Sequence, residues 1–154
     1  MIEGVIVTPL RQIYHPKGDV FHAMKRLDPG FDGFGEAYFS SIKGGLVKAW
    51  KCHYRMTLNL VCIVGKIHFV LCDRRDNSTT KGEFMEITLS PDMPETYRRL
   101  TIPPGVWMGF VGIDENKSIL LNVANIPHDP TEQVNIPIEE SDIKFDFGSI
   151  DLTK

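Results

Sequence analysis

The chain has 154 residues, of which 42% are apolar, 10% aromatic and 24% charged. This length and composition are those of one ordinary globular domain, so we expect a single domain over residues 1–154 and exclude global disorder. The 17 lysines and arginines against 20 acidic residues give a formal charge of -3, which leaves no overall basic field for sequence-independent binding of nucleic acid.

Short segments with a period of two, separated by Gly, Pro, Asn or Asp, dominate the chain and predict an all-β fold. The clearest hairpin joins residues 58–64 to residues 67–72 through a two-residue loop that contains Gly65. In chain order the expected strands are residues 36–42, 46–50, 58–64, 67–72, 82–89, 100–102, 106–113, 119–123 and 134–138, and one short helix is expected near residues 92–97. Strands of this number and spacing indicate a sandwich or a barrel.

The cysteine content and the hydropathy pattern indicate the cellular environment. Cys52, Cys62 and Cys72 are odd in number and lie inside apolar runs, so we expect buried, reduced thiols and no disulfide framework. No apolar run approaches the roughly 18 residues of a membrane span, and no basic segment followed by an apolar one begins the chain. We therefore expect a cytoplasmic protein that does not insert into a membrane.

Several motifs follow one another in an order that resembles a known family. They are KGDVF at residues 17–21, GLVKAWKCH at 45–53, LV at 60–61, GKI at 65–67, DRR at 73–75 followed by Ser78 and Gly82, LSP at 89–91 and IPPGVWMGF at 102–110. Together, over about residues 10–147, they resemble the small cupins related to dTDP-4-keto-6-deoxyglucose 3,5-epimerase. The resemblance implies a cupin-type jelly-roll β-barrel, in agreement with the strand pattern, and a homodimer with exchanged N-terminal strands.

Many cupins hold a metal ion through histidine and glutamate side chains. The resemblance locates these ligand positions at Lys51, His53, Leu58 and Met108. Only His53 can ligate well, and a divalent ion usually needs three or four N, O or S ligands. We therefore expect neither a metal nor another cofactor.

The catalytic positions of the epimerase family are substituted in this chain. Epimerisation beside a ketone needs a base, a donor for the enolate oxygen and an acid on the opposite face. By resemblance, the base falls on Lys51, the two cationic donors fall on Asn59 and Met108, and the catalytic tyrosine falls near Asn122. The aspartate that orients the base lies, in the family, in a C-terminal extension that is short here.

Three functions remain open at this point. The first is a metal-free epimerase or isomerase that acts on a nucleotide-activated keto sugar in surface-polysaccharide biosynthesis, of the rhamnose-type deoxysugar kind. Its catalytic residues would be Lys51 as the base, His53 on the same strand face, and Asn59 as a hydrogen-bond donor to the oxyanion. The second is a nucleotide-sugar binder without chemistry, and the third is an assembly protein that has lost the epimerase residues. The enzyme is the leading hypothesis.

A further set of residues is expected to bind the substrate, through charge on a pyrophosphate or by position in the family's site. These residues are Lys17, Lys48, Arg55, Arg75, Trp107, Met108 and Asn122. Several have an equally simple structural role, since Arg75 could pair with a carboxylate and Trp107 could belong to the core. Lys48 and Lys51 have opposite parity in one strand, so at most one of them should point inward.

Overall fold

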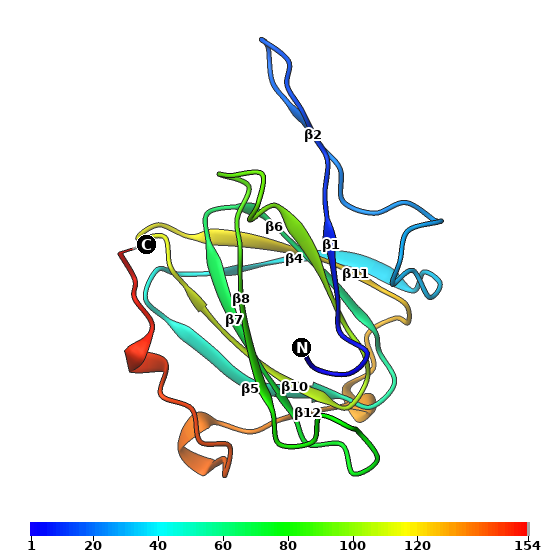
Figure 1. The fold of residues 1–154 in the computed structure, drawn as a ribbon, viewed down its shortest axis with the longest axis vertical. Helices are drawn as coiled ribbons and strands as arrows, with labels where there is room; N and C mark the ends of the chain where they lie inside the picture. Colours follow the sequence, from blue (N-terminus) through cyan, green and yellow to red (C-terminus); the bar gives the residue numbers. More distant parts are fainter. Residues whose placement is uncertain (154) are drawn as a thin grey trace.

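The structure, a computed structural model, describes residues 1–153, which form two facing five-stranded sheets and a small hairpin (Figure 1). In the first sheet the strands lie in the order β1 (Ile6–Pro9), β9 (Arg98–Ile102), β6 (Leu58–Val64), β11 (Ser118–Ala124) and β4 (Glu36–Ile42). In the second sheet the order is β12 (Gln133–Asn135), β5 (Val47–His53), β10 (Val106–Gly112), β7 (Ile67–Asp73) and β8 (Phe84–Leu89). All paired strands within the sheets are antiparallel.

The remaining elements are short. Strands β2 (Gln12–Ile13) and β3 (Val20–Phe21) form a hairpin that projects beyond the two sheets (Figure 1). Three 3-10 turns, η1 (Pro130–Glu132), η2 (Ile138–Glu140) and η3 (Phe147–Ser149), are the only helical elements in the described part of the chain. No helix in residues 1–153 has the length and apolar character that a membrane span requires.

Two apolar clusters hold the sheets in place. The larger one fills the space between the sheets, and its fully buried side chains include Phe69, Leu71, Leu89 and Leu100. The smaller one lies on the outer face of the second sheet, where Trp50, Val70 and Cys72 are covered by Ile143, Phe145 and Phe147. Residues 143–150, which we call the C-terminal segment, therefore shield the sheet that carries β5 from solvent.

Two turns that contain a glycine with positive φ lie near opposite ends of β6. Gly65, at φ 81°, forms the tight turn between β6 in the first sheet and β7 in the second, and a Cβ atom there would lie 2.2 Å from Ser118 Oγ. Gly105, at φ 87°, completes the turn between β9 and β10, and its N–H donates to the carbonyl of His53 at 2.7 Å. The second turn thus packs directly against the end of β5 that carries His53.

The expected all-β fold of the cupin barrel type is confirmed, and strands form at residues 58–64 and 67–73. The hairpin expected between these two strands is wrong. Strand β6 pairs with β9 and β11 in the first sheet and β7 pairs with β10 and β8 in the second, so the turn at Gly65 passes from one sheet to the other. The short helix expected near residues 92–97 is wrong. The N–H groups of Thr96 and Tyr97 both bond to the carbonyl of Met93, which makes a tight turn, and the chain then extends into β9. Strands β1 to β3 were not expected, because segments of two to four residues show too little periodicity to detect.

The three cysteines are free and buried, as expected. Burial raises the pKa of the Cys52 thiol to about 11 and that of the Cys62 thiol to about 12. A thiol that stays protonated is a poor nucleophile, so these side chains serve as small apolar groups in the core.

Candidate active site

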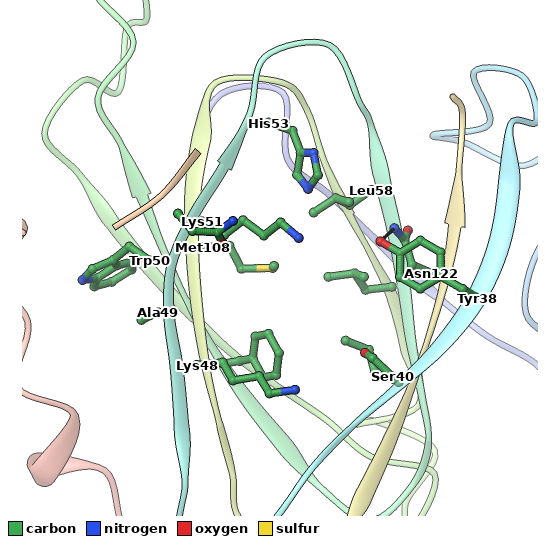
Figure 2. Close-up of a pocket in the computed structure, with 14 residues that line it drawn as sticks. Tyr38, Ser40, Lys48, Ala49, Trp50, Lys51, His53, Leu58, Met108 and Asn122 are labelled. Atoms are coloured by element: carbon green, nitrogen blue, oxygen red, sulfur yellow. Dashed lines mark hydrogen bonds between the residues drawn. The ribbon is translucent and has the colours of Figure 1, made fainter. Parts of the chain in front are cut away.

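A cavity of about 430 Å³ lies between the two sheets (Figure 2). Its walls come from β4 and β11 on one side and from β5 and β10 on the other, with β6 adding apolar side chains. The lining residues are Tyr38, Ser40, Lys48, Ala49, Trp50, Lys51, His53, Leu58, Leu60, Met108, Phe110, Leu120, Asn122 and Asn135. The polar groups thus face one another across an apolar interior, an arrangement typical of small-molecule sites.

His53 forms a buried pair with Glu132, which η1 brings to the end of β5. His53 Nδ1 lies 2.5 Å from Glu132 Oε1, and the two side chains are 5% and 1% exposed. The other carboxylate oxygen of Glu132 accepts the backbone N–H groups of Arg55 and Met56, each at 3.1 Å. A carboxylate with these three donors is ionised, so the histidine must donate from Nδ1, and Nε2 keeps its lone pair.

The electrostatics of this pair favour a neutral imidazole. Burial lowers the pKa of His53 below its usual value, although the hydrogen bond and the charge of Glu132 act in the opposite direction. Burial acts to raise the pKa of Glu132, but the hydrogen bonds from His53 and from two backbone N–H groups outweigh it and hold that pKa low. Near neutral pH, His53 is therefore a base with an oriented, unprotonated Nε2.

Tyr38 and Asn122 stand on the opposite wall, on the neighbouring strands β4 and β11 (Figure 2). Asn122 Oδ1 accepts the backbone N–H of Asn59 at 3.0 Å, which fixes the orientation of the amide group. Asn122 Nδ2 then donates to the Tyr38 hydroxyl oxygen at 3.0 Å. Because the tyrosine oxygen accepts this bond, its own proton remains available for donation to a molecule in the cavity.

Both Lys48 and Lys51 line the cavity, which corrects the expectation that at most one would point inward (Figure 2). On β10, Met108 pairs with Lys51 and Phe110 pairs with Lys48, so one β10 residue opposes two residues of β5. This extra residue in β5 shifts the alternation by one position and returns both lysines to the same face.

The two lysines differ in their surroundings. Lys48 is exposed, and its Nζ donates to the Ser41 carbonyl on β4 at 2.8 Å. Lys51 reaches toward the middle of the cavity, and its ammonium group has no hydrogen-bond or ion-pair partner among the described residues. Burial lowers the pKa of Lys51, and the charge of Lys48 adds to this effect while that of Glu132 opposes it.

Asn59, expected among the catalytic residues, does not reach the cavity. It alternates with Leu58 and Leu60, which line the cavity, so its side chain projects from the other face of β6. Its amide donates to the Gly30 carbonyl at 3.0 Å and accepts from the Thr101 hydroxyl at 2.6 Å. The side chain of Asn59 therefore anchors the loop that contains Gly30 and is not available as an oxyanion donor.

Four of the expected substrate-binding residues also lie outside the cavity lining. Arg75 is held by Asp73, with Nε 2.9 Å from its carboxylate, and by the Glu3 carbonyl. Arg55 pairs with Asp129 at the surface, Trp107 packs in the outer apolar cluster, and Lys17 lies on the projecting hairpin. Met108 and Asn122, the other two besides Lys48, do line the cavity.

The positions at which cupins carry metal ligands come together here, as the frame of the family requires. Lys51, Leu58 and Met108 surround His53 in the cavity wall, and none of the three is a suitable ligand. Within residues 1–153 no cluster of three or more His, Cys, Asp and Glu side chains has the geometry to hold a metal ion. The absence of a metal remains a prediction.

Glu132 and Tyr38 are the site residues that the sequence did not reveal. Glu132 lies 79 residues after His53 in an Asp-Pro-Thr-Glu segment, whose Asp129 caps the turn at Thr131 N. The residue types in that segment predict a turn, but they do not show where the glutamate side chain points. Tyr38 was in an expected strand, and its shared parity with Ser40 was the available sign of a polar inward face.

The fold and the cavity together define a cupin-type barrel with an oriented imidazole base on one wall and a phenol on the other. Comparison with known proteins identifies the family. The family model described as dTDP-4-dehydrorhamnose 3,5-epimerase matches residues 40–154. The chain belongs to this family of sugar-nucleotide epimerases and isomerases, which confirms the resemblance and the function class expected from the sequence.

Individual relatives agree with this assignment. A solved dTDP sugar isomerase from Desulfovibrio desulfuricans G20 is 39% identical, with a TM-score of 0.93 over 99% of this chain and 96% of that chain. The spore coat polysaccharide biosynthesis protein SpsL of Bacillus subtilis is 26% identical over 97% of this chain and 98% of its own length. An epimerase from Legionella pneumophila, solved with dTDP-4-keto-L-rhamnose, is 18% identical over 87% of this chain and 73% of that chain and shares the fold, with a TM-score of 0.75.

Proposed function

We propose that this protein epimerises a nucleotide-activated 4-keto-6-deoxy sugar at a carbon beside the keto group, in the biosynthesis of a surface polysaccharide. The observation that carries the proposal is the placement of His53, paired with Glu132, across the cavity from Tyr38. Epimerisation requires removal of a proton from one face and its return to the other. Groups on opposite walls of one cavity meet that requirement.

In this mechanism His53 Nε2 removes the proton on the carbon next to the ketone. The positive charge that develops on the imidazole is stabilised by Glu132, which is already ionised. The Lys51 ammonium, which has no partner among the described residues, would face the enolate oxygen. Tyr38 then delivers a proton to the opposite face of the sugar, and Asn122 holds its hydroxyl in place.

The nucleotide part of the substrate requires positive charge near the cavity. Lys48 is the exposed cation of the lining, and its bond to the Ser41 carbonyl is exchangeable for a phosphate oxygen. The related structure that holds dTDP-4-keto-L-rhamnose supports dTDP as the nucleotide. The non-catalytic binder is less well supported, because a binder has no need of a buried, ionised Glu132 that orients a neutral histidine.

The protein is further proposed to act as a homodimer in the cytoplasm. The projecting hairpin carries Tyr14 and Val20, which are 80% and 52% exposed, and a second copy would cover such apolar side chains. Three reduced thiols suit the reducing cytoplasm.

The test is proton exchange with solvent. Wild-type protein, His53→Gln and Tyr38→Phe are incubated with dTDP-4-keto-6-deoxyglucose in D₂O, and NMR follows the protons at C3 and C5. We expect exchange and a new epimer with the wild type, and loss of both with His53→Gln. Tyr38→Phe should retain exchange without inversion, because the base can still return the proton to the face from which it came. Tight binding of the substrate without exchange in the wild type would instead support the binder.

A further inference from the structure

The extra residue in β5 forms a β-bulge opposite Gly109 of β10. Between the pairs Lys51–Met108 and Lys48–Phe110, Ala49 and Trp50 together oppose Gly109 alone. A Cβ atom at residue 109 would lie 2.7 Å from the Ala49 Cβ, so β5 and β10 can approach this closely only with a glycine at position 109. The bulge and Gly109 are therefore one structural unit.

Phe147 of the C-terminal segment fills the outer side of this unit. Its Cζ would lie 2.8 Å from a Cβ at Gly109, and its ring centre lies 5.3 Å from that of Trp50. Trp50, only 1% exposed, borders the cavity, but its ring projects to the outer side of β5 (Figure 2). The backbone of Trp50 is also paired with Ile136 by two hydrogen bonds of 2.9 Å. The polypeptide after η1 thus holds the bulge both through its backbone and through an aromatic ring.

We propose that Phe147 is a positioning residue: by packing on Trp50 and Gly109 from outside the barrel, it keeps the extra residue in β5 and so places Lys48 and Lys51 in the same cavity. Two like charges in one partly buried cavity repel each other, so their arrangement needs support from the surrounding packing. In a regular strand, residues three apart point to opposite faces, and one of the two lysines would leave the cavity. The proposal concerns the lysine arrangement and rests on the proposed function only for its kinetic readout.

The lysine arrangement can be measured without substrate. The charges around Lys51 are those of Lys48, which lowers its pKa, and of Glu132, which raises it, while burial has the largest effect and lowers it. NMR of protein labelled at the lysine ε-carbons reports the titration of each ammonium group, with Lys51→Arg and Lys48→Arg to assign the two signals. In Phe147→Ala we expect the Lys51 titration to move upward by about 0.5 pH units or more, toward that of an exposed lysine.

The matched control is Phe145→Ala. Phe145 belongs to the same segment, and its ring centre lies 5.8 Å from that of Phe84 and 5.0 Å, edge to face, from that of Phe147. Within residues 1–153 it forms no aromatic ring pair with Trp50. This variant loses a comparable apolar area, so it should lower thermal stability to a similar degree while the Lys51 titration stays at the wild-type value. With an active substrate, Phe147→Ala should lower kcat by roughly tenfold, whereas Phe145→Ala should not.

An unchanged Lys51 titration in folded Phe147→Ala would overturn the proposal, as would an equal change in both alanine variants. Should Phe147→Ala fail to fold, Gly109→Ala tests the same unit from the other side, because its methyl group would displace Ala49 and the bulge. If Lys51 titrates in Gly109→Ala at the same pH as in the wild type, the proposal is refuted. If no keto sugar is turned over by the wild type, the proposed function fails, but the titrations still decide the role of Phe147.

Discussion

At the scale of single residues, the bond between His53 and Glu132 determines both the tautomer of the imidazole and the pH range in which it can accept a proton. Burial holds the pKa of His53 below its usual value of about 6.5, and Glu132 limits that decrease. Because catalysis requires the neutral imidazole, kcat/KM should be maintained to a pH below 6.5 and fall only as His53 becomes protonated. The acidic limb of the profile thus reports the electrostatics of this one pair.

Replacing Glu132 by glutamine tests this reading. The neutral amide cannot stabilise a positive imidazole, so we expect kcat/KM to fall by roughly 100-fold or more. Loss of the negative charge also lowers the pKa of His53 further, so the acidic limb should move to lower pH. The measurement is kcat/KM between pH 4.5 and about 8. Glu140→Gln makes the same change at an exposed position in η2 and should leave the profile unaltered, whereas a shift of the limb to higher pH in Glu132→Gln would contradict the assignment.

At the scale of elements, the turn that follows β7 depends on the carboxylate at the end of that strand. Asp73 is buried and accepts hydrogen bonds from Arg75, from Ser78 Oγ at 2.5 Å and from Thr80 Oγ1 at 2.6 Å. The hydrogen bond from Arg75 makes the largest contribution, and together these donors hold the pKa of Asp73 well below its usual value. Arg75 is thereby a structural residue of the turn, although its charge first suggested a phosphate ligand.

The stability of the protein should therefore depend on pH through Asp73. Since the folded pKa lies below the unfolded value of about 3.9, the stabilisation is complete above about pH 5 and is lost as the pH falls below about 4. Asp73→Asn should lower the free energy of unfolding by about 2–3 kcal/mol at pH 7, and the difference from wild type should shrink in acid. Urea unfolding at pH 7 and pH 3 measures both effects. Asp76→Asn, which removes an exposed partner of Lys81, should change little at either pH. Equal destabilisation by both variants would refute this role of Asp73.

At the scale of the whole molecule, the proposed homodimer depends on the projecting hairpin. It contacts the barrel through Phe21, whose ring meets Tyr97 edge to face at 5.6 Å, and through Gln12, whose amide donates to the Pro91 carbonyl. Tyr14, further along the hairpin, is 80% exposed. Tyrosine is among the residues that most often dominate an interface, so this side chain is the natural anchor for a second copy.

Sedimentation equilibrium should show the wild type as a dimer, and Tyr14→Ser should raise the dissociation constant by roughly tenfold or more. Tyr54→Ser provides the matched control, because Tyr54 is 60% exposed and follows β5 rather than belonging to the hairpin. It should leave the dissociation constant unchanged. A monomeric wild type, or equal effects of the two substitutions, would argue against the hairpin as the dimer contact.

The sequence by itself determined the strand-rich fold, because alternation of apolar residues and glycine or proline turns are local signals. The strands on either side of Gly65 and the turn that ends in Gly105 could be predicted in this way, and the ordered motifs around Lys51 and Met108 identified the family. The expected pairing of the two strands that flank Gly65 was wrong, because their partners come from distant segments in two different sheets. The motifs also placed His53, Met108 and Asn122 in the region that the structure shows as a cavity. Each of these inferences needed only residues that are near one another in the chain.

The tertiary structure alone decided which side chains meet in the cavity. Glu132 reaches His53 across 79 residues, and Tyr38 meets Asn122 across 84, distances over which no local pattern carries information. Both lysine side chains point into the cavity because of the register between β5 and β10. The Asn59 side chain points away from it because the face of β6 that carries Asn59 packs against the loop at Gly30. Strand alternation predicts orientation only while a strand is regular. Packing between distant segments determines where that regularity breaks, and so it determined the chemistry of this site.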